Sequence, residues 1–288
     1  MICFHHNDLD GRCAAGIIET YFGSGIKSPI KYVETNYNRI FPLDIIEQNE
    51  VVYIVDYSIK PEIMEKLLKI TTNITWIDHH KTADEYKYSQ EITGLRITED
   101  KKYSGCELVW IYLFGEESKM PMAVQLIGDR DKWAWKLTDT AAFNEGMKLN
   151  DCDPTSNTWK RLIYNDTLLI DNIIENGHVC IKHRDMIMND YCNSCGWETT
   201  FEGYKCFANG VYMFGSEGFG NRFNAYDICI SYEFTGDNWV VGLYSKTVDV
   251  GAIAQKYGLK YNTSGGGHKG AAGFVAPELP FKKIPKEV

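Results

Sequence analysis

Three apolar runs of the sequence each end in side chains that can bind a metal ion or a phosphate. Residues 2–4 lead into His-His-Asn-Asp-Leu-Asp-Gly at 5–11, residues 51–55 lead into Asp56, and residues 74–77 lead into Asp78-His79-His80. One such run alone would be an ordinary strand end with a capping acid. Because the pattern occurs three times, we expect parallel strands whose carboxyl ends converge on one site, the position where open α/β sheets bind ligands.

The side chains at these ends, with one acid from a later segment, form a candidate set of metal ligands. The set is His6, Asp8, Asp10, Asp56, His79 and one of Asp129 or Asp131. Several carboxylates with two imidazoles and no thiolate suit manganese or magnesium better than structural zinc. The set is too large for one ion, which predicts two ions about 3.5–4 Å apart, bridged by a carboxylate and a water. Asp56, alone at the tip of an expected central strand, is the natural bridge.

A pair of divalent ions supports a specific kind of reaction. It generates a hydroxide near neutral pH and neutralises charge on a phosphate during in-line attack, so the expected reaction is hydrolysis of a phosphoester or phosphoanhydride. His80, next to His79, would bind or protonate the phosphate oxygens. Asp78 would lie behind the ligands and orient a histidine by accepting its other N–H.

Helices between the strands would hold these residues in place. Apolar residues at 14, 17, 18, 21 and 22 have helical spacing, so a strand, a tight turn and a helix follow one another at the amino terminus. Pro61 suits the first turn of a second helix that runs to about residue 69. The separation of Asp56 and Asp78 then fits one crossover helix between parallel strands. Ser104 and Glu107 have capping-box spacing before another helix.

The second half of the chain changes character at Gly196. Residues 157–195 have a helical pattern and would connect two domains, whereas 197–208, 227–234 and 239–246 resemble strands and 250–257 a short helix. A glycine-rich segment at 264–274 carries His268 and Lys269 at its centre. Small residues let backbone amides approach an anion closely, so with Lys246 nearby this segment is a plausible phosphate clamp.

Composition limits the class of protein. The chain has 288 residues, 44% of them hydrophobic and 24% charged, which is typical of a globular protein with room for two domains. No segment resembles a signal peptide or a membrane span, so we expect a soluble, cytoplasmic protein without a membrane partner. A net charge of -9 disfavours binding of long nucleic acid through a broad basic surface, but it allows small phosphorylated ligands.

The cysteines do not indicate a disulfide framework. Their number, nine, is odd, and they are scattered in a chain without an export signal, so reduced thiols are expected. His178, His183, Cys192 and Cys195 have spacing that could hold a structural zinc. We favour a helix there instead, because the intervening residues have a helical pattern and nothing marks a tight turn.

The motifs, taken in order, resemble those of the DHH phosphoesterase family with its carboxy-terminal DHH-associated domain. They are His6-x-Asp8-x-Asp10-Gly11, Asp56, Asp78-His79-His80, Asp131-Lys132-Trp133 and the late Gly-Gly-Gly-His-x-x-Ala-Ala-Gly. Members of this family include RecJ-type exonucleases, nano-RNases, cyclic dinucleotide phosphodiesterases and family II pyrophosphatases. The opening motif and Asp-His-His-Lys-Thr at 78–82 are most similar to oligoribonucleases of the nano-RNase B type.

The resemblance implies roles for individual residues. One manganese would bind His6, Asp8 and Asp56, and the other would bind Asp10, Asp56, His79 and Asp131. Asp131 is preferred to Asp129 because of the residues that follow it. The substrate would be held by Gly265, Gly266, Gly267 and His268. Lys246 lies where relatives often have an arginine that binds substrate, so the resemblance leaves the substrate specificity of this protein open.

The predicted fold is α/β and has three parts. A DHH domain with a mostly parallel sheet flanked by helices would span 1–156, a helical connector 157–195, and a smaller α/β domain 196–288, with the active-site cleft between the domains. We predict a manganese-dependent phosphodiesterase, with magnesium as an alternative ion, that cleaves short oligonucleotides or dinucleotides by attack of a hydroxide bridging two ions. A homodimer is compatible with the sequence.

Two other functions use the same motifs. The first is a phosphohydrolase for a cyclic dinucleotide, a nucleotide 3′-phosphate or pyrophosphate. The second belongs to another class, a catalytically inactive nucleotide-binding module, since a fold does not fix a function. A degenerate module would have lost ligands, and every expected position is filled here. The net negative charge of the chain disfavours an exonuclease that acts on long strands.

Overall fold

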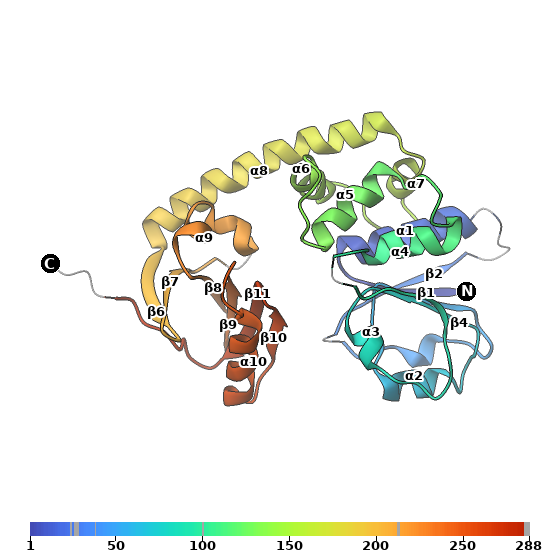
Figure 1. The fold of residues 1–288 in the computed structure, drawn as a ribbon, viewed down its shortest axis with the longest axis horizontal. Coiled ribbons are helices and arrows are strands. Elements are labelled where there is room, and N and C mark those ends of the chain that lie inside the picture. Colours follow the sequence, from blue (N-terminus) through green and yellow to red (C-terminus); the bar gives the residue numbers. More distant parts are fainter. Residues whose placement is uncertain (24, 26–28, 38, 100, 212–213, 285–288) are drawn as a thin grey trace. The chain divides into compact units, whose positions relative to one another are not determined.

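The computed structural model consists of two compact units, Met1–Cys180 and Ile181–Val288 (Figure 1). It describes all residues except 24, 26–28, 38, 100, 212–213 and 285–288. The long helix α8 (Thr167–Cys195) begins in the first unit and ends in the second. The boundary between the units therefore falls inside the predicted connector 157–195. Across the described part of the chain, no helix combines the length and the apolar character that a membrane crossing requires.

The first unit contains a parallel five-stranded sheet. Its strands, in spatial order, are β2 (Lys31–Thr35), β1 (Ile2–His6), β3 (Val52–Val55), β4 (Ile74–Asp78) and β5 (Thr93–Arg96). Val55 pairs with both His5 and Ile77. The next residues of the three central strands, among them Asp56, therefore emerge side by side at the carboxyl edge of the sheet, as the sequence predicted.

Helices cover both faces of this sheet (Figure 1). One layer contains α1 (Leu9–Phe22), α4 (Gly105–Phe114), α5 (Met122–Asp131), α6 (Thr140–Met147) and α7 (Asn157–Ile163). The other contains α2 (Pro61–Leu67), α3 (Thr82–Glu85) and the 3-10 turn η1 (Leu43–Ile45). Along β3, Tyr53 and Val55 enter the first core while Val52 and Ile54 enter the second. Both faces are buried, which explains why this strand is apolar throughout.

The second unit is built on a mixed six-stranded sheet. Its strands, in spatial order, are β10 (Gly265–His268), β11 (Ala271–Ala276), β9 (Trp239–Tyr244), β8 (Ile228–Phe234), β7 (Tyr204–Asn209) and β6 (Trp197–Phe201). Among the described strands of this second sheet, only the β7–β8 pair is parallel. Helix α10 (Val250–Tyr261) packs on one face of the sheet and forms one hydrophobic core with it. The 3-10 turn η2 (Gly215–Phe219) and helix α9 (Arg222–Ala225) contribute to a second hydrophobic core of this unit. The α/β class predicted for both domains is confirmed.

The glycine-rich segment forms the β10–β11 hairpin, which packs on α10. A Cβ on Gly265 would lie 2.2 Å from the carbonyl oxygen of Ala254, so this glycine is required by close packing. Gly267 has φ +140, and a Cβ there would lie 2.7 Å from Cα of Ala272. Gly266 has open space where a Cβ would be, but its φ of +155 is one that residues with a side chain rarely adopt. Packing and backbone conformation therefore explain all three glycines without an anion.

The alternative zinc cluster lies along a single helix. His178, His183, Cys192 and Cys195 are all within α8. At about 1.5 Å per residue, the first and last of them are roughly 25 Å apart along its axis. Within the described ranges, no group of residues close enough to hold a metal ion includes any of the four. The helical interpretation of this segment is confirmed.

Candidate metal centre

Asp56 is the residue from which the candidate site is built. It follows β3 directly, its N–H donates to the carbonyl of Ile77 (2.9 Å), and its φ of +53 is unusual for a residue with a side chain. A Cβ on Gly105, at the start of α4, would lie 2.5 Å from Cβ of Asp56. The glycine thus lets the helix approach, and the turn and helix together leave Asp56 only 1% exposed. Such strain at a buried acid is typical of functional sites.

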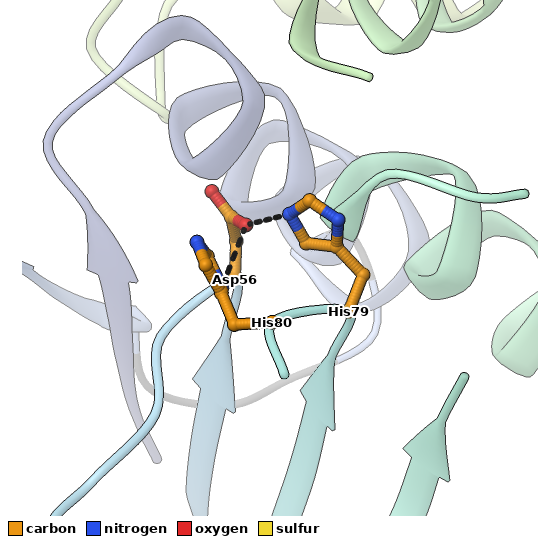
Figure 2. A group of neighbouring side chains, drawn as sticks. All are labelled: Asp56, His79 and His80. Atoms are coloured by element: carbon orange, nitrogen blue, oxygen red, sulfur yellow. Dashed lines mark ion pairs between the residues drawn. The ribbon is translucent and has the colours of Figure 1, made fainter. Parts of the chain in front are cut away.

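Three histidines surround the Asp56 carboxylate. Nε2 of His79 lies 3.2 Å from Oδ1, and Nδ1 of His80 lies 3.9 Å from the same oxygen (Figure 2). Nδ1 of His6 lies 3.9 Å from Oδ2 and 2.6 Å from Oδ2 of Asp8. Asp8 also caps helix α1 by accepting a hydrogen bond from the N–H of Gly11 (2.9 Å). The loop after β1 and the loop after β4 thus meet at the tip of β3.

The innermost polar atoms of the site have no hydrogen-bond partner. In the described part of the chain this holds for both carboxylate oxygens of Asp56 and for Nε2 of His79. Burial, together with the charges of Asp10 and Asp8, raises the pKa of Asp56 well above its usual value. Burial lowers the pKa of His79, which keeps its imidazole neutral. Buried polar groups are normally paired, so these atoms are well placed to bind a ligand.

Asp10 links the site to helix α4. Its Oδ2 accepts a hydrogen bond from the N–H of Gly105 (2.7 Å) and its Oδ1 accepts one from Oγ of Ser104 (2.8 Å). The partial positive charge of a helix N-terminus favours a carboxylate there. The same carboxylate lies close enough to His79 and Asp131 for the three to share a cation. Asp10 can therefore position a helix and still offer lone pairs to a metal ion.

Asp131, and not Asp129, faces the other candidate ligands. At the end of α5, its Oδ2 lies 3.4 Å from Nε2 of His79, and its side chain is 23% exposed. Burial and the neighbouring charges of Asp10 and Asp8 raise its pKa well above the usual value. Asp129 instead accepts hydrogen bonds from Lys136, Leu137 and Thr140, which follow α5 in the chain. Asp131 is thus the acid that the structure brings to the site.

Asp78 lies behind the site and holds His80. Its carboxylate is fully buried, and its Oδ1 accepts hydrogen bonds from Nδ1 of His80 (2.7 Å) and from the N–H of His79 (2.8 Å). Its Oδ2 accepts from Oγ of Ser58. Burial alone would lower the pKa of His80, but the hydrogen bond and charge of Asp78 outweigh it and raise that pKa. Asp78 therefore favours a protonated His80 in a fixed orientation.

The residues present fit a divalent metal. Three groups have ligand atoms close enough together to hold an ion: Asp56, His79 and His80; His6, Asp8 and Asp56; and Asp10, His79 and Asp131. All six predicted ligands occur in these groups, and Asp56 belongs to two of them. Hard carboxylate oxygens together with imidazole nitrogens match the preference of manganese or magnesium. The acids repel one another without a cation, so their arrangement is best explained by cation binding.

The residues predicted to bind substrate lie in the second unit. Gly265, Gly266, Gly267 and His268 form strand β10, where His268 is exposed. Nζ of Lys246 donates to Oδ1 of Asn224 and lies 5.3 Å from the ring centre of Phe223. Their role in substrate binding, and the cleft between the two domains, stay predictions.

Sequence reasoning missed two residues next to the site. The ring of Tyr37 lies 5.7 Å from that of His6 and 6.2 Å from that of His80, measured between ring centres. Ser58 holds the far oxygen of Asp78. Tyr37 follows β2, so a correct prediction of that edge strand would have placed it at the same edge of the sheet.

Comparison of the sequence with known proteins finds a viral relative. No family model matches the sequence. An uncharacterized protein of Acanthamoeba polyphaga mimivirus is 25% identical over 309 residues, which cover 99% of this chain and 70% of that protein.

Solved structures show a likeness over nearly the whole chain. A DHH domain from a member of the S1p family of ribosomal proteins matches with a TM-score of 0.60 and 13% identity, over 96% of this chain and 82% of the other. A pGpG-specific phosphodiesterase from Vibrio cholerae matches with a TM-score of 0.53 and 15% identity, over 96% and 93%. Exonuclease RecJ bound to manganese matches with a TM-score of 0.52 and 13% identity, over 96% and 85%.

These likenesses concern the fold. The chain has the two-unit α/β fold of the DHH-domain proteins, as its motifs predicted. The motif residues of the first unit converge at the carboxyl edge of the parallel sheet of that fold.

Proposed function

We propose that this protein is a metal-dependent phosphodiesterase that hydrolyses short oligonucleotides or dinucleotides. The observation that carries the proposal is the buried, unpaired carboxylate of Asp56 among the three histidines and the acids of the first unit. The exonuclease and the pGpG-specific phosphodiesterase of similar fold support a phosphodiester substrate. The manganese in that exonuclease supports the choice of metal.

The charge of the site favours two divalent ions. Asp8, Asp10, Asp56 and Asp131 supply four carboxylates, whose charge two such ions would balance. His6, Asp8 and Asp56 would hold one ion, and Asp10, Asp56, His79 and Asp131 the other. Bound there, the ions would neutralise charge on the phosphate and activate a water near neutral pH.

The protein's own residues supply the remaining functions. His79 offers a neutral nitrogen because burial lowers its pKa, and a metal ligand must be deprotonated. His80 favours the protonated state, so it can donate to a phosphate oxygen or to the departing oxygen. Asp78 fixes the ring of His80 through the 2.7 Å hydrogen bond. We expect the hairpin of the second unit, with the open Gly266 and His268, to contact the rest of the substrate.

A substrate panel tests the proposal. Purified protein is incubated with manganese or magnesium and with RNA of two to five nucleotides, a cyclic dinucleotide, a nucleotide 3′-phosphate or pyrophosphate. We expect manganese-dependent cleavage of the shortest RNAs, with kcat/KM highest for a dinucleotide. Faster hydrolysis of pyrophosphate or of the 3′-phosphate would replace this proposal with a small-molecule phosphohydrolase. Absence of hydrolysis of every substrate with either metal would indicate an inactive binding module.

A further inference from the structure

An aromatic ring lies beside two of the three histidines of the metal centre, His6 and His80. Tyr37 follows β2, the neighbour of β1 in the sheet, and so reaches the carboxyl edge next to His6. The ring centres of Tyr37 and His6 are 5.7 Å apart, and those of Tyr37 and His80 are 6.2 Å apart. A planar group in contact with Tyr37 would therefore be a neighbour of a phosphate held by these histidines.

The ring of Tyr37 ends a stack of aromatic side chains that begins in the core. It stacks on Tyr57 with 4.8 Å between ring centres and 25° between planes, and Tyr57 is parallel to Phe41 within 17° at 6.3 Å. Phe41 in turn contacts Phe4 of β1, 4.5 Å between centres. Tyr57, Phe41 and Phe4 are buried. Their packing fixes the inner face of the Tyr37 ring.

The hydroxyl of Tyr37 fixes the ring further. It accepts a hydrogen bond from the N–H of Ser58 (3.2 Å), the residue whose hydroxyl binds Asp78. Yet 46% of Tyr37 is exposed. An aromatic side chain held on one face and open to solvent elsewhere is preorganised to stack on a planar ligand, since little freedom is lost on binding.

We propose that Tyr37 stacks on a nucleobase of the substrate, on a nucleotide that flanks the phosphate bound at the metal centre. The inference rests on the proposed function and specifies it, because it makes the site prefer nucleotide substrates to phosphates without a base. Every nucleobase has a face that stacks on an aromatic ring, so the preference extends to all four bases. Tyr57, behind Tyr37, would be the support of this platform.

The test compares two changes at Tyr37 with a matched change elsewhere. Tyr37→Leu removes the ring, and Tyr37→Phe keeps the ring but loses the hydroxyl. Tyr164→Leu is the control, because Tyr164 is 70% exposed at the end of α7. Each variant is assayed on a 5′-phosphorylated dinucleotide and on the same compound with abasic sugars. Binding of both compounds is also measured by calorimetry with calcium, another ion that carboxylates bind, so that affinity is read independently of turnover.

Stacking predicts a change that depends on the base. Tyr37→Leu should raise KM and Kd for the dinucleotide about 5- to 150-fold, the range known for loss of one stacked base. Its kcat/KM on the abasic compound should stay within about twofold of the unaltered protein, and Tyr37→Phe and Tyr164→Leu should behave like that protein on both compounds. Equal losses on both compounds, or no loss on either, would overturn the inference.

The proposed function and this inference can fail separately. If the protein cleaves the abasic compound with the same kcat/KM as the dinucleotide, it is a phosphodiesterase but the stacking is refuted. If it cleaves neither, the proposed function fails, and calorimetry decides the inference alone. A Kd for the dinucleotide that Tyr37→Leu weakens and Tyr37→Phe preserves would support it. Equal binding by all variants, or no binding by the unaltered protein, would refute it.

Discussion

Asp56 and Asp129 are buried to a similar extent, 1% and 5% exposed, but their carboxylates differ in the hydrogen-bond donors around them. Asp129 accepts hydrogen bonds from the N–H groups of Lys136 (3.0 Å) and Leu137 (3.1 Å) and from Oγ1 of Thr140 (2.5 Å). Burial would raise its pKa, yet these hydrogen bonds lower it. Asp56 has no such donors among the described residues, and its pKa is raised. The segment after α5 thus supplies hydrogen-bond donors to the carboxylate of Asp129, whereas the described residues around the tip of β3 supply none to that of Asp56.

This difference separates structural acids from candidate ligands more sharply than burial does. Asp129 and Asp131 are two residues apart on α5, yet burial and the charges of other acids raise the pKa of Asp131, whereas hydrogen bonds outweigh burial and lower the pKa of Asp129. A buried charge without partners is costly, so an acid that remains in this state indicates a group that binds there. Removal of the charge of Asp56 should therefore lower activity without a loss of stability, whereas removal of the charge of Asp129 should lower stability.

The largest effect is expected for Asp56→Asn. The change keeps the shape of the side chain, and asparagine tolerates the φ of +53 at this position. Loss of the carboxylate shared by two candidate metal groups should lower kcat by at least about a thousandfold, more than the effect usual for residues that only orient ligands. Steady-state kinetics on the dinucleotide with manganese measures this.

The stability of the same variant sharpens the comparison. Without metal, Asp56→Asn should unfold at a temperature equal to or higher than that of the unaltered protein. The reason is that the change removes a buried negative charge that the neighbouring carboxylates repel. The folded pKa of Asp56 is raised, so its charge destabilises the metal-free protein progressively above a pH of about 4. The advantage of the variant should therefore grow from pH 4 toward neutral pH. Asp171→Asn, on the exposed side of α8, is the control and should change neither kcat nor the unfolding temperature.

Metal binding should stabilise the folded protein through the first unit. At a manganese concentration 100 times the Kd, the free energy of unfolding should rise by about 2.7 kcal/mol. Asp131→Asn should reduce this gain, whereas Asp129→Asn should keep it. Calorimetric or fluorescence melting with and without manganese tests the expectation. An equal gain in Asp131→Asn and the unaltered protein would contradict the assignment of Asp131 as a ligand.

Asp129→Asn should act on stability instead. The amide cannot accept all three hydrogen bonds without leaving its own N–H groups buried, so we expect a loss of about 1–3 kcal/mol in the free energy of unfolding. The folded pKa of Asp129 is lowered, so its contribution is present above a pH of about 4 and is lost as the pH falls through the folded pKa. Denaturant unfolding should show a loss at pH 7 that shrinks below pH 4. A loss independent of pH would show that the charge is unimportant.

The convergence of the strand ends could be predicted from the sequence for a physical reason. Central parallel strands are buried on both faces, so they appear as short apolar runs, and the polar residues after them must lie at one edge. This reasoning placed His6, Asp56 and His79 correctly at that edge. It could not choose between Asp129 and Asp131, because the choice depends on residues 136–140 folding back to bind the Asp129 carboxylate.

The residues that sequence reasoning missed lie in elements with weak patterns. The edge strand β2 (Lys31–Thr35) is only partly buried, so it lacks a continuous apolar run and Tyr37 after it carried no signal. The glycines of β10 indicated a loop for anions, yet Gly265 is required by its contact with Ala254 of α10. That contact joins distant parts of the chain, and local composition does not report it.

The smallest effect is expected for Ser58→Ala, which tests the acid that is paired but lies beside the site. Asp78 would lose the donor to its Oδ2 but keep His80 and the N–H of His79 on Oδ1. Because His80 is still held, kcat should fall by about 10-fold and by no more than about 100-fold, the range usual for residues that act through a neighbour. Ser58→Thr retains a hydroxyl and should recover part of the rate. A thousandfold loss in Ser58→Ala would place Asp78 with Asp56, as an acid on which the reaction depends directly, and the division between paired and unpaired acids would then fail.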